Sequence, residues 1–214
     1  MMIISLTGFM GCGKSSVGRR LSELLCCPFM DLDQVIEERE GRTIPEIFSQ
    51  NGEPAFRQME LEALKSIIMT SEPRQCVPLA PSHSKAAGPS HYAGVRKCQF
   101  HTHASSPKEL QSEDNTLILA LGGGAVMMEE CAEIVRSETK CIYLRASVDT
   151  LIEHLEGQTD DRPLLAHEGA ALRDRIADLM ARRSDTYEKT AHIIIDTDGK
   201  SIEAVASEII SKLA

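Results

Sequence analysis

Tryptophan is absent from the 214-residue chain, and aromatic residues together make up only 4% of it. Aliphatic side chains, methionine and cysteine must therefore fill the hydrophobic core. An excess of basic residues is also missing, because 23 Lys and Arg stand against 32 Asp and Glu and give a net charge of −9. That balance is unfavourable for binding nucleic acid or an anionic membrane surface, and we expect neither partner. Any anionic ligand must be held by a local cluster of basic groups.

Long hydrophobic runs are absent as well. No apolar stretch approaches the length of about 18 residues that spans a bilayer. The apolar segment 1–7 is short, has no basic region before it and runs into glycines, unlike a signal peptide. The seven cysteines are odd in number and irregularly spaced, which favours a reducing compartment over a disulfide framework. We therefore expect a cytoplasmic protein.

Short apolar segments alternate with amphipathic ones along most of the chain. The predicted strands span residues 3–7, 29–32, 116–121, 141–144 and 192–195, and the predicted helices span 14–25, 34–40, 44–49, 53–69, 129–136, 148–155, 170–183 and 201–213. The alternation predicts an α/β protein with a parallel sheet and helices on both faces.

One segment, residues 74–114, has no sustained hydrophobic period and is rich in Ser, Pro, Ala and His. A connection of this length is unusual inside a compact domain and indicates an insertion. Cys98 and His101 have the spacing of metal ligands, but Cys76 is distant, so a polar loop is the favoured interpretation. We expect a single domain over residues 1–214, with the insertion at the sheet edge opposite the catalytic residues.

A phosphate-binding motif follows the first predicted strand. Residues 8–15 (GFMGCGKS) match G-x-x-x-x-G-K-[ST] and lie between a strand and a helix, the context of a P-loop. In such a loop, backbone N–H groups and the helix N-terminus converge on phosphate oxygens. Lys14 can bridge two phosphates, and the Ser15 hydroxyl can bind Mg²⁺. Cys12 lies inside the loop, where we interpret it as a small side chain that fits and not as a reactive thiol.

Acidic residues and glycines end two further strands. Asp31 and Asp33 follow the second strand, where two carboxylates can serve Mg²⁺ and a substrate hydroxyl, and Asp33 can also cap the next helix. Gly122, Gly123 and Gly124 follow the third strand, and three consecutive glycines indicate that another group approaches the backbone closely. These side chains and glycines should meet the P-loop at one edge of the sheet.

Together these motifs resemble the shikimate kinase family. The matching blocks are residues 8–17 (GFMGCGKSSV), 30–55 (MDLDQVIEEREGRTIPEIFSQNGEPA), 56–60 (FRQME), 119–126 (LALGGGAV), 162–165 (RPLL) and 180–187 (MARRSDTY). They cover the chain apart from residues 74–114. The resemblance implies a P-loop sheet like that of nucleoside monophosphate kinases, with five strands in the order 2-3-1-4-5.

The resemblance also implies the reaction, which is transfer of the ATP γ-phosphate to the 3-hydroxyl of shikimate with Mg²⁺. It assigns ATP binding to Gly11, Cys12, Gly13, Lys14, Ser15, Ser16 and Arg162, and Mg²⁺ to Ser15 and Asp31. It assigns shikimate binding to Asp33, Arg57, Gly123, Gly124 and Arg183, with Arg183 at the end of its helix. Lys14, Asp33 and Arg162 are the implied catalytic residues, and Asp33 is the candidate base. We expect a monomer.

One departure from the family pattern concerns the adenine site, and two other functions stay open as alternatives. The family carries an adenine-stacking arginine shortly before the Arg-Pro of its lid, but here His154 is the only basic residue between Ala146 and Arg162. Either nucleotide affinity is therefore weaker than in the family, or Lys200 and its neighbours pack the adenine instead. Another carboxylate kinase, such as gluconate kinase, is the alternative enzyme, because gluconate is also a monocarboxylate. A nucleotide-binding protein without transfer activity, docking through its insertion, is the alternative outside enzymes.

Overall fold

Five short strands form one parallel sheet in the computed structural model, which describes residues 2–69, 116–155 and 170–213. The strands are β1 (Met2–Thr7), β2 (Phe29–Asp31), β3 (Thr116–Ala120), β4 (Lys140–Arg145) and β5 (Ile193–Asp196). Their order is β2-β3-β1-β4-β5, and every pairing is parallel. The expected fold class and strand order are confirmed.

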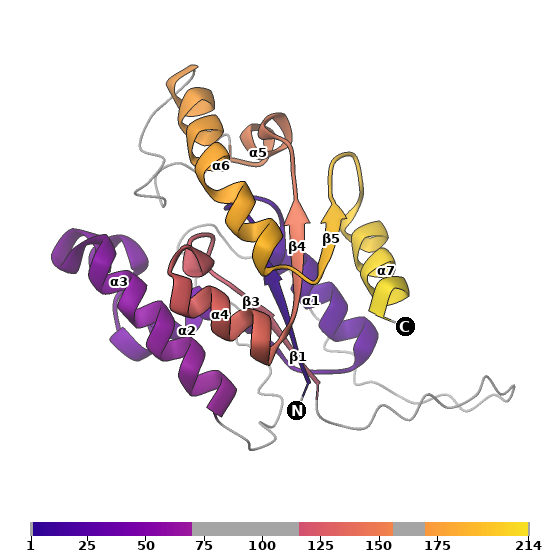
Figure 1. Cartoon of the computed structure of the whole chain (residues 1–214), viewed down its shortest axis with the longest axis horizontal. Coiled ribbons are helices and arrows are strands. Elements are labelled where there is room, and N and C mark those ends of the chain that lie inside the picture. The colour runs from indigo at the N-terminus through magenta and orange to yellow at the C-terminus, as the bar shows by residue number, and fades with distance from the viewer. Residues whose placement is uncertain (1, 70–115, 156–169, 214) are drawn as a thin grey trace, which may run out of the picture. The chain divides into compact units, whose positions relative to one another are not determined.

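Helices cover both faces of this sheet (Figure 1). They are α1 (Lys14–Leu25), α2 (Leu32–Glu40), α3 (Ile44–Met69), α4 (Glu129–Glu138), α5 (Val148–Leu155), α6 (Ala170–Thr190) and α7 (Ile202–Leu213), with a 3-10 turn η1 at Ala125–Met127. Helices α1 and α7 pack together against one face, whereas α4 and α6 contact β4 from the other. Right-handed crossover connections between parallel strands require this two-sided arrangement.

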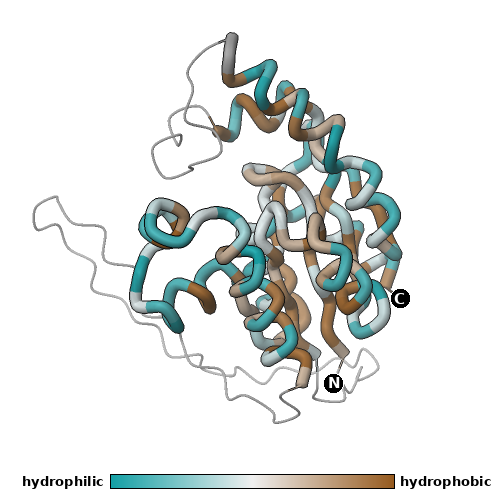
Figure 2. The backbone as a smooth tube through the Cα atoms, turned by 60° about the vertical axis from the view of Figure 1, so that its left-hand side comes forward, coloured by the Kyte–Doolittle hydropathy of each residue, from teal (hydrophilic) through white to brown (hydrophobic). Residues whose placement is uncertain are grey.

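The hydrophobic core follows the strands. Figure 2 shows hydrophobic residues concentrated in the central strands, whereas the helices alternate hydrophilic and hydrophobic residues. Leu6, Ile118, Leu119 and Ile142 are completely buried. A parallel strand covered on both faces needs a continuous apolar run, which explains why these segments do not alternate in hydropathy.

Helix α3 contains a break where the sequence predicts a gap between two helices. Gly52 has φ 77° and ψ 172°, so the chain leaves the helical conformation there and resumes it at Glu53. Pro54 stands in the first turn of the resumed helix, where its missing N–H is harmless. The break places Arg57 one turn into a new helix.

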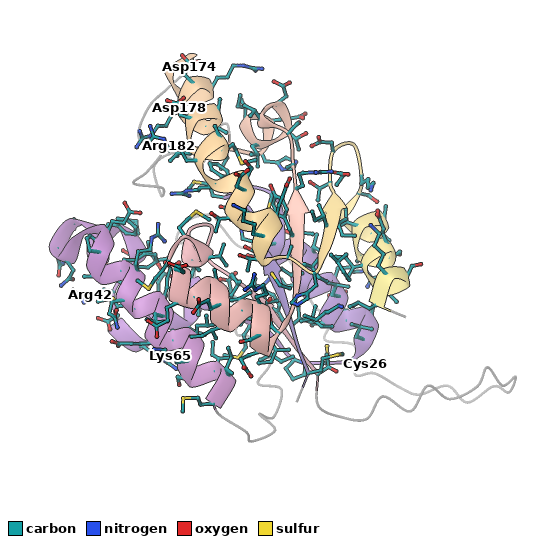
Figure 3. All side chains as sticks on the ribbon, viewed as in Figure 1. Cys26, Arg42, Lys65, Asp174, Asp178 and Arg182 are labelled. Atoms are coloured by element: carbon teal, nitrogen blue, oxygen red, sulfur yellow. The ribbon has the colours of Figure 1, made fainter. Side chains whose placement is uncertain are left out.

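Helix α6 is longer than the sequence predicts, and the expected end at Arg183 is wrong. The helix continues to Thr190, which places Arg183 in its interior. Asp174, Asp178 and Arg182 point outward in Figure 3, whereas Leu172, Ile176 and Tyr187 are buried on the inner face. Burial of Tyr187 favours helical continuation through Ser184, Asp185 and Thr186, whose intrinsic helix propensities are low.

The predicted insertion at 74–114 lies entirely outside the described residues. Strand β3 begins at Thr116, which pairs with Met2 at the start of β1. The chain therefore enters β3 at the amino ends of the strands, whereas the P-loop follows the carboxyl end of β1. Within the described ranges, no helix is long and apolar enough to cross a membrane.

Candidate active site

A cavity of about 1160 Å³ opens at the carboxyl edge of the sheet. Residues from the P-loop, from the segment after β2, from α3 and from the glycine turn after β3 share its wall. The predicted site residues that line it are Gly11, Gly13, Lys14, Ser15, Ser16, Asp31, Asp33, Arg57, Gly123, Gly124 and Arg183. The fold therefore brings together nearly all of the residues expected from the sequence.

The P-loop connects β1 to α1 as predicted. Gly11 and Gly13 have φ values of 83° and 90°, a region that disfavours other residues. Lys14 Nζ donates hydrogen bonds of 2.9 Å to the carbonyl oxygens of both Gly8 and Phe9, so its ammonium group lies over the loop. A cation and a helix N-terminus at one concave loop favour a polyphosphate ligand.

Among the P-loop residues assigned to ATP binding, Cys12 is the one that does not line the cavity. Its side chain is only 3% exposed, and its backbone N–H donates to the Phe9 carbonyl oxygen at 3.2 Å. Among the described cysteines, Cys12, Cys26, Cys131 and Cys141 are free thiols.

Ser15 and Asp31 present two adjacent oxygen ligands at the cavity. The Ser15 hydroxyl donates to Asp31 Oδ2 at 2.6 Å. Hydroxyl and carboxylate oxygens suit Mg²⁺, which binds with substrate phosphates and not in an all-protein cage. In the described part of the chain, no group of three or more His, Cys, Asp or Glu side chains could hold a metal by itself. The residues present thus fit Mg²⁺ bound together with a nucleotide.

Asp31, and not Asp33 as the sequence suggested, caps helix α2. Asp31 has an extended backbone and its Oδ1 accepts the Asp33 N–H at 3.1 Å, because it precedes the first helical residue. The Asp33 side chain is thereby left for the cavity. Its Oδ1 is buried and accepts no hydrogen bond from any described residue. Burial, and secondarily the charge of Asp31, raises the pKa of Asp33 to about 6.

The glycine turn after β3 is crowded at each of its three positions. A Cβ at Gly122 would meet Glu60 Oε1 and Asp33 Oδ1, and a Cβ at Gly124 would meet the Arg57 guanidinium. At Gly123 it would lie 3.1 Å from the backbone nitrogen of Met10 in the P-loop. The expected close approach is confirmed, and it comes from charged side chains as well as from the P-loop backbone.

Arg57 and Glu60 form a buried ion pair beside this turn. The Arg57 guanidinium donates to Glu60 at 2.6 Å and to Glu53 at 2.8 Å. Glu60 is 1% exposed, and its second oxygen, Oε1, makes no hydrogen bond within the described residues. Burial raises the pKa of Glu60 to about 7 although Arg57 opposes the shift. The pair holds the guanidinium against Gly124.

Arg183 reaches the same turn from helix α6. Its guanidinium is 7% exposed, lies 5.9 Å from the centre of the Phe9 ring and donates to the Gly123 carbonyl oxygen at 3.4 Å. No carboxylate in the described ranges forms a salt bridge with it. Tyr187, one turn further along α6, also donates a hydrogen bond to Gly123 O. Two side chains of one helix therefore converge on one carbonyl.

Sequence reasoning missed Glu60, Tyr187 and His154 as parts of this site. Glu60 and Tyr187 stand inside the blocks FRQME and MARRSDTY, so the family pattern contained them without giving them a role. His154 Nδ1 bonds to the Gly11 carbonyl oxygen at 2.8 Å and faces the cavity with Lys200. Arg162 lies outside the described residues, and its predicted role remains a prediction.

A P-loop and a pocket of paired arginines and carboxylates in one cavity define a small-molecule kinase of the P-loop class. A family model described as "Shikimate kinase" matches residues 10–77 and 104–214. The chain is 35% identical over 210 residues to a shikimate kinase of Thermus thermophilus, covering 98% of this chain and 89% of the relative. It is 32% identical over 212 residues to one of Dictyoglomus turgidum, covering 98% and 96%. The chain belongs to the shikimate kinase family.

Solved structures agree with this family membership. A shikimate kinase of Acinetobacter baumannii in complex with shikimate superposes with a TM-score of 0.73 at 27% identity, covering 100% of this chain and 93% of the other. A shikimate kinase of Aquifex aeolicus gives a TM-score of 0.65 at 28% identity, covering 99% and 96%.

The buried Asp33 carboxylate should destabilise the unliganded protein at neutral pH. Between its ordinary pKa of 3.8 and its folded value of about 6, the folded state retains a proton that the unfolded state loses. Stability therefore falls as pH rises through this window and stays lower above it. Asp33→Asn removes this penalty, so we expect its melting temperature to exceed that of the wild type by several degrees at pH 7.5 and by much less at pH 4.5.

Thermal denaturation of both proteins without ligands measures this difference. Asp149→Asn, at an exposed position of α5, controls for a general effect of removing negative charge. An Asp33→Asn advantage that is the same at both pH values would contradict the raised pKa.

Proposed function

We propose that this chain is an ATP-dependent kinase that phosphorylates the 3-hydroxyl of shikimate, yielding shikimate 3-phosphate and ADP. The observation that carries the proposal is Arg183, a buried guanidinium without a carboxylate partner in the described residues, facing the cavity of the P-loop. A buried cation without an ion partner is costly, and a carboxylate on the substrate offsets that cost. Shikimate brings such a carboxylate together with hydroxyl groups.

In this proposal, shikimate, the phosphoryl acceptor, binds in the part of the cavity lined by Asp33, Arg57 and Arg183, which we call the acceptor half. Arg57 and Arg183 hold the carboxylate, assisted by the backbone N–H groups of Gly123 and Gly124. Asp33 binds the hydroxyls of the ring and acts as the base. A carboxylate with a pKa near 6 is ionised at neutral pH and is still a better proton acceptor than an exposed aspartate.

The donor half binds ATP along the P-loop. Gly11 to Ser16 hold the phosphates, Lys14 carries the compensating charge, and His154 keeps the Gly11 carbonyl in place. Lys200 and its neighbours are proposed to pack the adenine, since they line the same cavity. Ser15 and, through water, Asp31 would hold Mg²⁺, which neutralises phosphate charge when bound.

The transfer itself needs positioning more than covalent chemistry. The oxygen of the 3-hydroxyl forms a bond to the γ-phosphorus while the bond from that phosphorus to the bridging oxygen of ADP breaks. Asp33 takes the hydroxyl proton, and ADP leaves with the bridging electron pair. Lys14, together with Arg162, stabilises the charge on the transferring phosphoryl group. All proposed residues come from one chain, so we propose a monomeric enzyme, acting in the cytoplasm where ATP is available.

ADP release with Mg-ATP tests the proposal directly when shikimate, gluconate or no acceptor is added. We expect strong stimulation by shikimate only. Stimulation by gluconate alone would assign the chain to another carboxylate kinase. Bound ATP without stimulation by either acid would indicate a nucleotide-binding protein without transfer activity.

Arg183→Lys should weaken shikimate binding selectively. Lysine keeps the charge but loses the planar fork that binds two carboxylate oxygens, so we expect the KM for shikimate to rise about tenfold or more. The KM for ATP should stay within twofold of the wild-type value. The control is Arg182→Lys at the adjacent position, which points outward from α6 in Figure 3. Equal effects of the two substitutions on the shikimate KM would exclude the proposed role.

Arg162→Ala should lower kcat. If Arg162 closes on the transferring phosphate like an arginine finger, its removal lowers kcat by roughly 10³-fold. Steady-state kinetics at saturating ATP and shikimate measure this effect. A loss of kcat smaller than about threefold would remove Arg162 from the catalytic residues.

Residues 78–103 lie between the two segments matched by the family model, and we propose that they are dispensable for catalysis. Replacing them with a short Gly-Ser linker should leave kcat/KM for shikimate within threefold of the wild type. A tenfold or greater loss, in a variant whose melting temperature is unchanged, would show that the insertion contributes to the active site.

A further inference from the structure

Tyr187 has a direct connection to the glycine turn, although the proposed mechanism gives it no function. The residue is completely buried, and its ring stacks on Tyr143 with centroids 5.1 Å apart. Its hydroxyl donates to the Gly123 carbonyl oxygen. Burial raises the pKa of Tyr187 well above its ordinary value, so the hydroxyl keeps its proton throughout the neutral range.

The orientation of the Gly123 carbonyl determines where the next N–H points. No described peptide bond is cis, and in a trans peptide the C=O and the following N–H point in opposite directions. Fixing Gly123 O toward Tyr187 therefore directs the Gly124 N–H away from α6. The hydrogen bond that closes the turn, from Ala125 N–H to Gly122 O at 3.1 Å, uses neither the Gly123 nor the Gly124 N–H. Both of these glycines line the cavity.

Arg183 is connected to the same tyrosine. Its Nη1 donates at 3.4 Å to Gly123 O, the same carbonyl oxygen that accepts from the Tyr187 hydroxyl. Because the two residues are four positions apart along one helix, their side chains lie on the same face of α6. The aromatic stack keeps the Tyr187 ring in place, so the hydroxyl can fix the carbonyl oxygen to which the guanidinium also donates.

We propose that Tyr187 is a positioning residue for the acceptor: its hydroxyl fixes the Gly123 carbonyl oxygen, to which Arg183 also donates, so that the turn's N–H groups and the guanidinium meet one carboxylate. This inference rests on the proposed function and adds a residue that determines acceptor affinity. The carboxylate is carried on a different ring carbon from the phosphorylated hydroxyl, and the Tyr187 hydroxyl acts on the groups that bind the carboxylate and not on the reacting atoms. Loss of the Tyr187 hydroxyl therefore weakens binding more than it slows the chemical step.

Tyr187→Phe removes the hydroxyl and keeps the ring stack. We expect the KM for shikimate to rise about tenfold, the effect of losing one buried hydrogen bond of ordinary strength. We expect kcat to stay within about threefold and the KM for ATP within twofold, since the phosphate cradle is untouched. Calorimetric titration of the variant with shikimate should show the same loss of affinity without turnover.

Tyr143→Phe is the matched control, because Tyr143 contributes the other ring of the stack but makes no hydrogen bond to the glycine turn. We expect it to leave the shikimate KM unchanged. A shikimate KM within twofold of the wild type for Tyr187→Phe overturns the inference. So does an equal rise in both substrate KM values, or an equal effect of the two substitutions, since either indicates a general packing defect. Wild-type protein that neither binds nor phosphorylates shikimate refutes the proposed function itself, and the inference with it.

Discussion

Charged side chains held out of water around the Gly122–Gly124 turn are the constraint on which the rest of the site depends. Asp33 and Glu60 each have a buried carboxylate oxygen without a hydrogen bond from the described residues, and both oxygens face Gly122. Arg57 is neutralised by Glu60, whereas Arg183 forms no salt bridge with a carboxylate in the described part of the chain. Unpaired buried polar atoms are unfavourable in the free protein. A ligand with one carboxylate and several hydroxyls pairs these groups at once.

The order of the strands brings these groups together. Strand β3 lies between β2 and β1, so the glycines that follow it are flanked by the acids after β2 on one side and the P-loop on the other. Helices α3 and α6 then add one arginine each from different directions. A side chain at any of the three glycines would collide with a group from one of these neighbours, which makes the turn the point of contact for donor and acceptor sites.

The sequence predicted the sheet, the P-loop and the crowded glycine turn because each has a local signal: an apolar run, a fixed spacing, or three consecutive glycines. It did not predict the roles of Glu60 and Tyr187, because their importance arises from contacts with residues distant in sequence. The weak helix formers after Arg183 suggested an end to α6, and that error separated Tyr187 from Arg183. Likewise, the raised pKa of Asp33 depends on burial, which spacing alone does not reveal.

The central claim is that the cavity presents the 3-hydroxyl of shikimate, and no other hydroxyl, to the γ-phosphate. Phosphorus–proton NMR of the product formed from ATP and shikimate tests this most directly, because coupling between phosphorus and a ring proton identifies the esterified carbon. We expect a single phosphate ester, at the 3-oxygen. An ester at another hydroxyl, a mixture of esters, or phosphate released to water without any ester would contradict it.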